Sequence, residues 1–323
     1  MKAARYFEQR LVHSVLLLIV TSMAIFGTSQ LAPGSFVDEM RLNPQISPQT
    51  MQALRMQFGV DQPLPTRYFR WLRSAAMGDF GYSLAYNLPV AKLLWSRLRN
   101  TLLLGTTAML VAWTAALLLG SWSTLRSGKL ADRTVSAISA FLLSTPELAL
   151  ALLAILLAAR FRILPAGGMT SIKTAKNSWE AVADVSRHLI LPMSVLALTA
   201  FPVLFRHLRA AMLEVWNSSF VHAARGHGIS DARLLVRHAV PAALSPMISL
   251  FGFSVAALVS GSFLVEVVTA WPGIGPLFLE AIYARDLHLV VAVVMLFTAF
   301  LILANLTADL LLYAADPRVR SEC

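Results

Sequence analysis

Charged residues are missing from long stretches of this chain, and that pattern predicts its main elements. Five stretches hold no Asp, Glu, Lys or Arg, and a sixth is interrupted only by Glu147: 11–37, 100–125, 188–205, 238–265, 287–308 and, interrupted, 134–159. Each is 18 to 28 residues long, and a helix needs about 20 apolar residues to cross the hydrocarbon of a bilayer. A spanning helix pairs its own backbone groups, so such runs are stable without water. The sequence therefore predicts an all-α membrane protein with six transmembrane helices.

The six helices are expected at about 11–31, 100–122, 134–158, 188–205, 244–265 and 287–313. Two of them carry a small residue at every fourth position: Ala108, Ala112, Ala116 and Gly120 in the second, and Gly252, Ala256 and Ser260 in the fifth. Faces of this kind let membrane helices approach closely. The pattern indicates a packed bundle.

The spacing of these helices divides the chain into segments. An N-terminal tail and the first helix occupy 1–31, an insertion on the outer face 32–97, a five-helix core 98–314 and a tail 315–323. Within the insertion, Ser47 and Pro48 have the types found at a helix start. Gly78-Asp79-Phe80-Gly81-Tyr82-Ser83 predicts a tight turn.

Composition and charge support a membrane location. The chain is 57% hydrophobic and 14% charged, whereas soluble domains carry about 25% charged residues. Its net charge is +10. The segments placed inside hold 13 Lys and Arg residues and the two short outer loops hold six. Because positive residues favour the cytoplasmic side, both termini are expected there. No Lys/Arg run with interleaved aromatics indicates nucleic acid.

Disulfides and a cleaved leader are not expected. The single cysteine, Cys323, is the last residue, so no intrachain disulfide or cysteine-based metal site is predicted. The N-terminus resembles a signal peptide, but no convincing small-x-small cleavage site follows its apolar run. We therefore expect a retained first helix.

Catalytic and metal motifs are absent from the sequence. It contains no Gly-x-Ser-x-Gly and no His-Glu-x-x-His, and Gly128-Lys129 lacks the flanking residues of a phosphate-binding loop. His222 and His227 are five residues apart and do not share a helix face. We predict a protein that is not an enzyme, binds no cofactor of its own and holds no metal.

The longest predicted cytoplasmic segment, 206–243, contains the most informative motif. Its pattern predicts a short helix, a glycine turn and a second helix: Ser218 or Ser219 as cap, Phe220, Ala223 and Ala224 as the apolar face, Gly226 and Gly228 as the end, then Ser230 and Asp231 as the next start. An ordinary structured loop and a docking element that enters a groove of a partner both fit this pattern.

The same segment resembles the EAA loop of ABC importer permeases, through Ala223-Ala224, Gly228, His238-Ala239-Val240 and Pro246. Four further stretches resemble the peptide/nickel subfamily: 58–63, 78–83, 271–275 and 316–320. Their order covers nearly the whole chain. The chain departs from the family at Pro241-Ala242-Ala243, where an Asn usually follows the His, and its outer loop over 160–187 is short.

The resemblance implies a permease of the type I ABC importer kind in the bacterial inner membrane, forming half of a pore for di- or oligopeptides. Implied partners are a second homologous permease, two cytoplasmic ATPase subunits or domains that hydrolyse ATP, and an extracytoplasmic substrate-binding protein. The residues implied to contact the ATPase are Phe220, Ala223, Ala224, Gly226, Gly228 and His238. Nickel or another metal chelate is an alternative substrate. An ion-coupled secondary transporter is an alternative class, which would need inverted repeats.

Two further sites are predicted from residues within or beside the spans. Glu147, next to Pro146, falls near the middle of the third helix, where a carboxylate is costly. It either faces a water-filled path, where it could meet the amino group of a peptide or a cationic chelate, or is a protonated or hydrogen-bonded packing residue. Trp271-Pro272-Gly273 is predicted to be an outer gating segment with its aromatic ring at the membrane interface.

Overall fold

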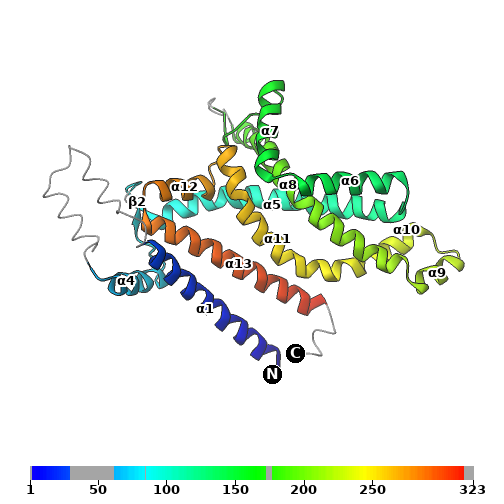
Figure 1. Ribbon diagram of the computed structural model, residues 1–323, viewed down its shortest axis with the longest axis horizontal. Helices are drawn as coiled ribbons and strands as arrows, with labels where there is room; N and C mark the ends of the chain where they lie inside the picture. Colours follow the sequence, from blue (N-terminus) through cyan, green and yellow to red (C-terminus); the bar gives the residue numbers. More distant parts are fainter. Residues whose placement is uncertain (1, 30–61, 84, 172–176, 316–323) are drawn as a thin grey trace. The chain divides into compact units, whose positions relative to one another are not determined.

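The structure is a computed structural model that describes residues 2–29, 62–83, 85–171 and 177–315 of the 323 in the chain. It is built of α-helices and one short hairpin (Figure 1). The chain divides into two compact units: unit 1 holds Met1–Tyr6, Thr101–Pro272 and Leu301–Cys323, and unit 2 holds Phe7–Asn100 and Gly273–Phe300. The helix predicted to start at Ser47 and the motif over 316–320 lie outside the described residues.

Most of the described elements are helices. The described helices are α1 (Lys2–Ser29), α4 (Leu64–Ala76), α5 (Val90–Leu125), α6 (Leu130–Ser144), α7 (Glu147–Phe161), α8 (Ser178–Trp216), α9 (Ser219–Gly226), α10 (Asp231–Leu234), α11 (Val240–Val268), α12 (Ile274–Tyr283) and α13 (Leu287–Ala315). A π-helical turn, Leu235–Ala239, joins α10 to α11. The strands β1 (Tyr82–Ser83) and β2 (Leu88–Pro89) pair antiparallel, with Tyr82 opposite Pro89.

Several helices are long and apolar enough to cross a membrane. Among the described residues these are α5, α8 and α13, and the bent pair α6 and α7 makes a fourth if it counts as one span. These helices agree with the predicted multi-pass helical membrane protein. The count of six and the outer position of the insertion stay predictions.

The third helix, predicted over about 134–158, is divided into α6 and α7. The two helices are bent by 103°, and the break falls at Pro146, directly before α7. A proline disfavours the helical conformation in the residue before it, and Thr145 is extended, with φ −91° and ψ 124°. Glu147 is therefore the first residue of α7 instead of a mid-helix residue.

Helix α8 is much longer than the predicted 188–205. Its 39 residues correspond to roughly 58 Å, about twice the thickness of the hydrocarbon core. Pro192 and Pro202 lie inside it. The helix continues through Arg206 to Trp216, so most of the first third of the predicted cytoplasmic segment is helical. As a result, α8 connects the apolar core of unit 1 directly to the start of α9.

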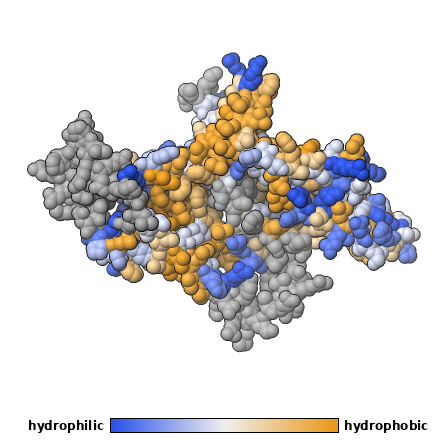
Figure 2. Space-filling model, viewed as in Figure 1, coloured by the Kyte–Doolittle hydropathy of each residue, from blue (hydrophilic) through white to orange (hydrophobic). Residues whose placement is uncertain are grey.

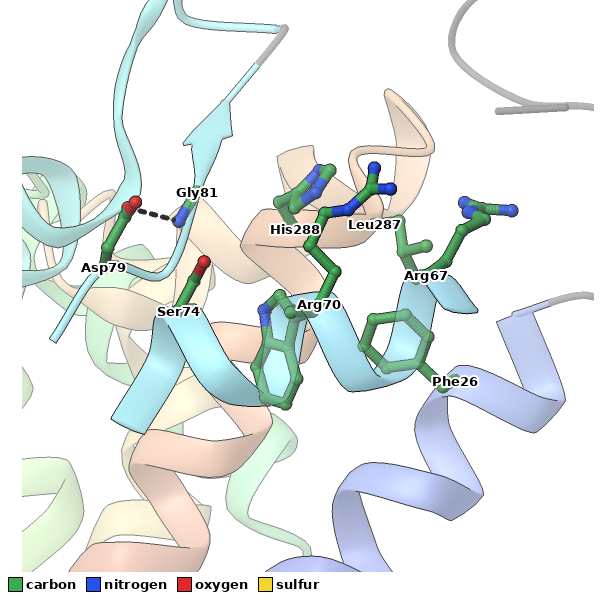
Figure 3. Close-up of a pocket in the computed structure, with 9 residues that line it drawn as sticks. Phe26, Arg67, Arg70, Ser74, Asp79, Gly81, Leu287 and His288 are labelled. Carbon is green, nitrogen blue, oxygen red and sulfur yellow. Dashed lines mark hydrogen bonds between the residues drawn. The ribbon is translucent and has the colours of Figure 1, made fainter. Parts of the chain in front are cut away.

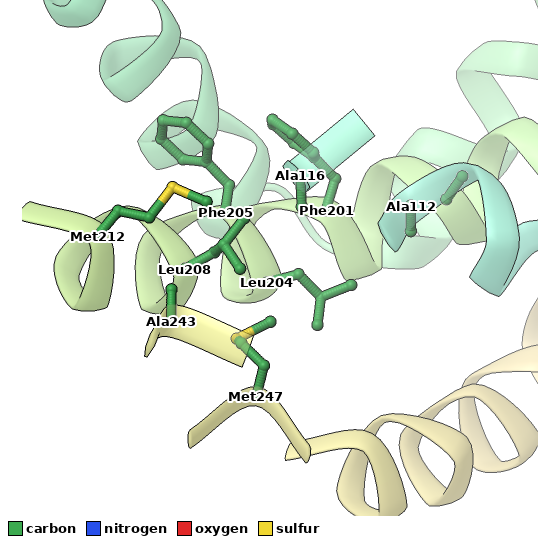
Figure 4. Packing of buried hydrophobic residues seen from close by; sticks show 10 residues of the cluster. Ala112, Ala116, Phe201, Leu204, Phe205, Leu208, Met212, Ala243 and Met247 are labelled. Atoms are coloured by element: carbon green, nitrogen blue, oxygen red, sulfur yellow. The ribbon is translucent and has the colours of Figure 1, made fainter. Parts of the chain in front are cut away.

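The core of unit 1 forms where α8 packs against α5, α6, α7 and α11. Figure 4 shows the side chains of α5, α8 and α11 that pack against one another in this core. They are Ala112, Ala116, Phe201, Leu204, Phe205, Leu208, Met212, Ala243 and Met247. The predicted small-residue face of α5 is confirmed as a packing face. Ala108, Ala112 and Ala116 are at most 1% exposed, and a Cβ on Gly120 would lie 3.1 Å from Leu208 Cδ2.

Gly252 allows α11 to pack closely against the part of α13 that belongs to unit 1. A Cβ at this position would lie 2.9 Å from the carbonyl oxygen of Ala304 and 2.9 Å from Ala308 Cβ. A larger residue would push the two helices apart. The small residue predicted to permit close approach therefore does so at this position.

Unit 2 has its own small aromatic core. Phe26 of α1 contacts Tyr68 and Trp71 of α4, with ring centroids 5.4 and 5.3 Å apart. Val291 of α13 completes the cluster. The hydroxyl groups of Ser22 and Tyr68 are 3.0 Å apart and hydrogen-bonded. These contacts fix α4 against α1 and α13.

Apolar side chains cover much of the helix surface in Figure 2. Large exposed hydrophobic residues lie along α5 and α7: Leu103, Leu110, Val111, Leu118, Leu148, Leu152, Leu153, Leu156, Leu157 and Phe161. Hydrophilic residues gather over α9 and α10 and at the end of α7. Exposed apolar area of this extent marks contact with lipid or with another apolar surface.

Candidate functional site

The segment that resembles the EAA loop forms a compact projection, residues 219–239, hereafter the elbow. It begins three residues after Trp216, the last residue of α8, and comprises α9, α10 and the π-helical turn. Ser218 occupies the predicted N-cap position of α9. Its hydroxyl, however, donates to the carbonyl of Val215 at 2.6 Å instead of accepting from α9. The predicted start is confirmed and the capping bond is not found.

Glycine ends α9 in the way the sequence indicated. Gly228 has a φ of +80°, a left-handed conformation that glycine adopts without steric cost. The amide of Gly228 donates to the carbonyl of Arg225 at 2.9 Å, and that of Ile229 donates to the carbonyl of Ala224 at 3.2 Å. This pair of bonds is a Schellman motif. Gly226 is the last residue of α9.

The elbow has a small core of its own. Trp216, Val221, Leu234, Leu235 and Ala239 are buried together. The Arg225 guanidinium lies 4.3 Å from the centre of the Trp216 ring, and its Nε donates to Asp231 Oδ1 at 2.8 Å. These contacts join α9 both to the end of α8 and to α10. The elbow is therefore attached to α8 by side-chain contacts as well as by the backbone.

The outward face of α9 combines one aromatic ring with small residues. Phe220 is 46% exposed, and its ring meets that of His238 edge to face at 5.4 Å. Ala223, Gly226 and Gly228 are exposed, whereas Ala224 is half-buried against the elbow core. Of the six predicted contact residues, the structure thus brings Phe220 and His238 together and turns Ala224 partly inward.

The second helix of the elbow, α10, is shorter than the sequence predicted. α10 has only four residues, and the π-helical turn then leads into α11 without a break in helical conformation at Ala239 and Val240. Pro241, which has no amide to donate, is the second residue of α11 and lies two residues after the π-helical turn. The departure from the family pattern at Pro241 therefore coincides with the start of a long helix.

A buried ion pair that the sequence did not reveal lies near the elbow. Asp132, in the first turn of α6, is 4% exposed. It accepts from Arg209 of α8 through Nε at 2.8 Å and Nη2 at 2.7 Å, from the amide of Gly128 at 2.9 Å and from the hydroxyl of Ser123. A carboxylate between Lys129 and Arg133 gave no sign of a partner 77 positions away. The pair joins α8 to the α5–α6 turn.

Glu147 lies at the α6–α7 break, with Pro146 directly before it. As the first residue of α7 it occupies the positive end of the helix dipole. Its Oε1 is buried, and no described residue donates a hydrogen bond to that oxygen. A Cβ on Gly261 of α11 would lie 3.3 Å from it. The carboxylate therefore faces the backbone of α11 with one oxygen unsatisfied within the described chain.

Trp271 is placed differently from its predicted position at a membrane interface. Its side chain is completely buried, in a cluster with Leu104, Ala108, Val195 and Leu196. Pro272 and Gly273 follow it, and Gly273 is the N-cap residue of α12. The gating role of this stretch stays a prediction, but its ring is part of the core of unit 1.

Two family models match the chain. The model described as binding-protein-dependent transport system inner membrane component matches residues 116–321. A second, for the N-terminal part of the membrane component of such systems, matches residues 3–105. Together they cover almost the full length.

Named relatives and solved structures agree with these matches. The chain is 33% identical over 322 residues to the oligopeptide transport system permease protein OppB of Mycobacterium tuberculosis, covering 98% of this chain and 99% of that protein. It is 30% identical over 318 residues to the oligopeptide transport system permease protein AppB of Bacillus subtilis, with the same coverage. A chain of the inward-facing MetNI methionine ABC transporter aligns with a TM-score of 0.54 at 18% identity, covering 69% of this chain and 96% of that one. The last similarity shows the fold alone.

The Asp132–Arg209 pair predicts a stability difference between two aspartate variants. Asp132→Ala leaves a largely buried guanidinium without its counter-ion, so we expect a loss of about 3 kcal/mol in the free energy of unfolding. Asp231→Ala removes the partner of Arg225 in a pair whose side chains are 31% and 59% exposed and should cost less than about 1 kcal/mol. Denaturant unfolding of both purified variants measures this. Equal losses would contradict a structural role for the buried pair.

Proposed function

Because the chain belongs to the family of binding-protein-dependent transport system inner membrane components, we propose that it forms half of the translocation pore of an ATP-driven peptide importer and is driven through the elbow. The proposal that the ATPase binds at the elbow is supported by the outward face of α9. On this face the exposed Phe220 lies beside small residues, and the elbow itself is attached to α8. The peptide substrate is supported by relatives along the full chain that are named oligopeptide or di/tripeptide permeases.

The proposed machine contains four kinds of component. This chain pairs with a second homologous permease, and two cytoplasmic ATPase subunits or domains bind and hydrolyse the ATP. An extracytoplasmic binding protein delivers the peptide. The chain itself sits in the bacterial inner membrane with both termini in the cytoplasm, and it binds no cofactor.

The elbow suits a contact that transmits force. An exposed aromatic ring surrounded by small residues can insert into a partner's groove while the partner approaches the backbone closely. A pull on α9 would be transmitted to α8 through the buried Trp216 and the Arg225 contacts. Arg209, two turns before the end of α8, is joined to Asp132 of α6 and to Ser123 near the end of α5. The elbow therefore contacts the end of α8, and α8 is in turn joined by polar contacts to α6 and α5.

Glu147 is proposed to contact the substrate during passage. Its unsatisfied Oε1 calls for a donor that the described chain does not supply, and a peptide's ammonium group would provide one. The glycine opposite, Gly261, leaves space beside that oxygen that a larger residue would fill. The bend at Pro146 places the carboxylate at the N-terminal end of α7, where the helix dipole favours a negative charge.

Phe220→Ala should uncouple transport while leaving the chain folded. Because anchors of this kind are worth about 2 kcal/mol or more at an interface, we expect affinity for the ATPase and peptide uptake to fall about thirtyfold. ATPase co-purification and uptake into reconstituted vesicles measure the two effects. The matched control is Phe161→Ala on α7, whose ring is 63% exposed and lies outside the elbow. Uptake by Phe220→Ala at the level of this control would contradict the docking assignment.

Glu147→Gln keeps the shape of the side chain and removes its charge. Loss of a charge-assisted hydrogen bond to an ammonium group is worth roughly 1.5–3 kcal/mol, so we expect peptide uptake to fall at least about tenfold at unchanged expression. Uptake of a radiolabelled tripeptide measures this. Glu180→Gln, an exposed carboxylate in the first turn of α8, is the control. Unchanged uptake and peptide preference in Glu147→Gln would remove the pathway role.

A further inference from the structure

Unit 2 contains a cavity of about 120 Å³ that the proposed coupling does not use. It opens between α1, α4, the turn at Asp79–Gly81 and the first turn of α13 (Figure 3). Its lining residues are Phe26, Arg67, Arg70, Trp71, Ser74, Asp79, Gly81, Leu287 and His288. The wall is thus partly apolar and partly cationic.

Helix α4 supplies one side of this cavity through a single stripe. Arg67, Arg70, Trp71 and Ser74 are spaced i, i+3, i+4 and i+7, which places them on one face of the helix. Trp71 and the neighbouring Tyr68 are buried against Phe26. The aromatic core of unit 2 therefore holds the two arginines in place at the cavity.

The lining carries more positive than negative charge. Arg67 and Arg70 share it with one carboxylate, Asp79, whose Oδ1 also accepts the amide of Gly81 at 2.9 Å. Arg70 donates one N–H to Gln62 at 2.6 Å, which leaves its other donors available. Burial lowers the pKa of Arg67, and no described carboxylate lies within ion-pair distance of it. A partly desolvated guanidinium of this kind favours an anionic partner.

The opposite wall depends on a glycine. Gly81 has a φ of +90°, and a Cβ at this position would lie 2.8 Å from Cδ2 of His288. The imidazole therefore occupies space that any larger residue at 81 would need. His288 also belongs to the first turn of α13, whose 29 residues direct the positive end of the helix dipole to this side.

We propose that this cavity binds a carboxylate group, with Arg67 and Arg70 as donors, and that the ligand is the free C-terminus of a short peptide. The planar guanidinium fork matches the two oxygens of a carboxylate, and the apolar wall of Phe26, Trp71 and Leu287 suits an adjacent aliphatic group. The carboxylate chemistry stands on the cavity alone. Only the choice of a peptide as its source rests on the proposed function.

Binding of trialanine to the full-length chain in detergent, without ATPase or binding protein, tests this proposal. Trialanine with a free carboxylate should bind saturably, and its C-terminal amide at least about tenfold more weakly, because a charge-assisted pair is lost. Arg67→Gln and Arg70→Gln should each weaken binding by a similar factor. Arg73→Gln is the matched control, since Arg73 lies on the same helix and does not line the cavity; its affinity should stay within about twofold.

Four results would overturn the assignment. Equal binding of acid and amide would exclude carboxylate recognition, and so would the absence of saturable binding up to about 10 mM. Equal effects of Arg73→Gln and Arg70→Gln would place binding elsewhere. An amidated peptide with an aspartate side chain that binds as tightly as trialanine would assign the site to acidic side chains instead of a C-terminus.

Arg70 is exposed, so Arg70→Gln remains informative if Arg67→Gln fails to fold. Since no step needs ATP, a negative result alongside intact ATP-driven uptake counts against this site only.

Discussion

The structure depends on the requirement that backbone polar groups in hydrocarbon be paired within the chain. Long helices such as α5, α8 and α13 meet this requirement along their whole length. The 103° break at Pro146 is where the pairing is interrupted, and that break carries the one carboxylate of α7. Close approach of the helices then depends on small residues, such as Ala112 of α5 and Gly252 of α11, because apolar lipid provides little hydrophobic driving force between helices.

Helix α8 connects the elbow to the core of unit 1. This helix extends from Ser178 to Trp216 and contacts α6, α7 and α11. The elbow is attached to its end by the buried Trp216 and by Arg225, and the Asp132–Arg209 pair attaches its side to the α5–α6 turn. A movement of α9 would therefore act on the end of α8 that lies beyond Pro202. Local flexing is opposed by the buried ion pair, because separating its members would leave a charge unpaired.

Sequence reasoning recovered the features that depend on local pattern. The apolar spans, the helix over 219–226 and the left-handed Gly228 follow from charge gaps and from turn chemistry between neighbouring residues. It failed where distant residues decide the outcome. The length of α8 beyond Phe205 reflects packing that overrides charged residues, and the Asp132–Arg209 pair joins residues with no local relation. Pro146 and Glu147 were predicted near the middle of one helix, whereas the chain bends by 103° between α6 and α7 and Glu147 starts the second of them. The pattern did not reveal that Trp271 is buried, because aromatic residues at span ends serve both interfaces and cores.

The central claim is that this chain is a passive conduit moved by an ATPase bound at the elbow. Peptide accumulation in vesicles containing the reconstituted complex, with ATP and with an imposed ion gradient supplied separately, tests it most directly. We expect accumulation with ATP that survives an uncoupler and is lost when the ATPase subunits are omitted. Accumulation by this chain alone under an ion gradient would contradict the claim.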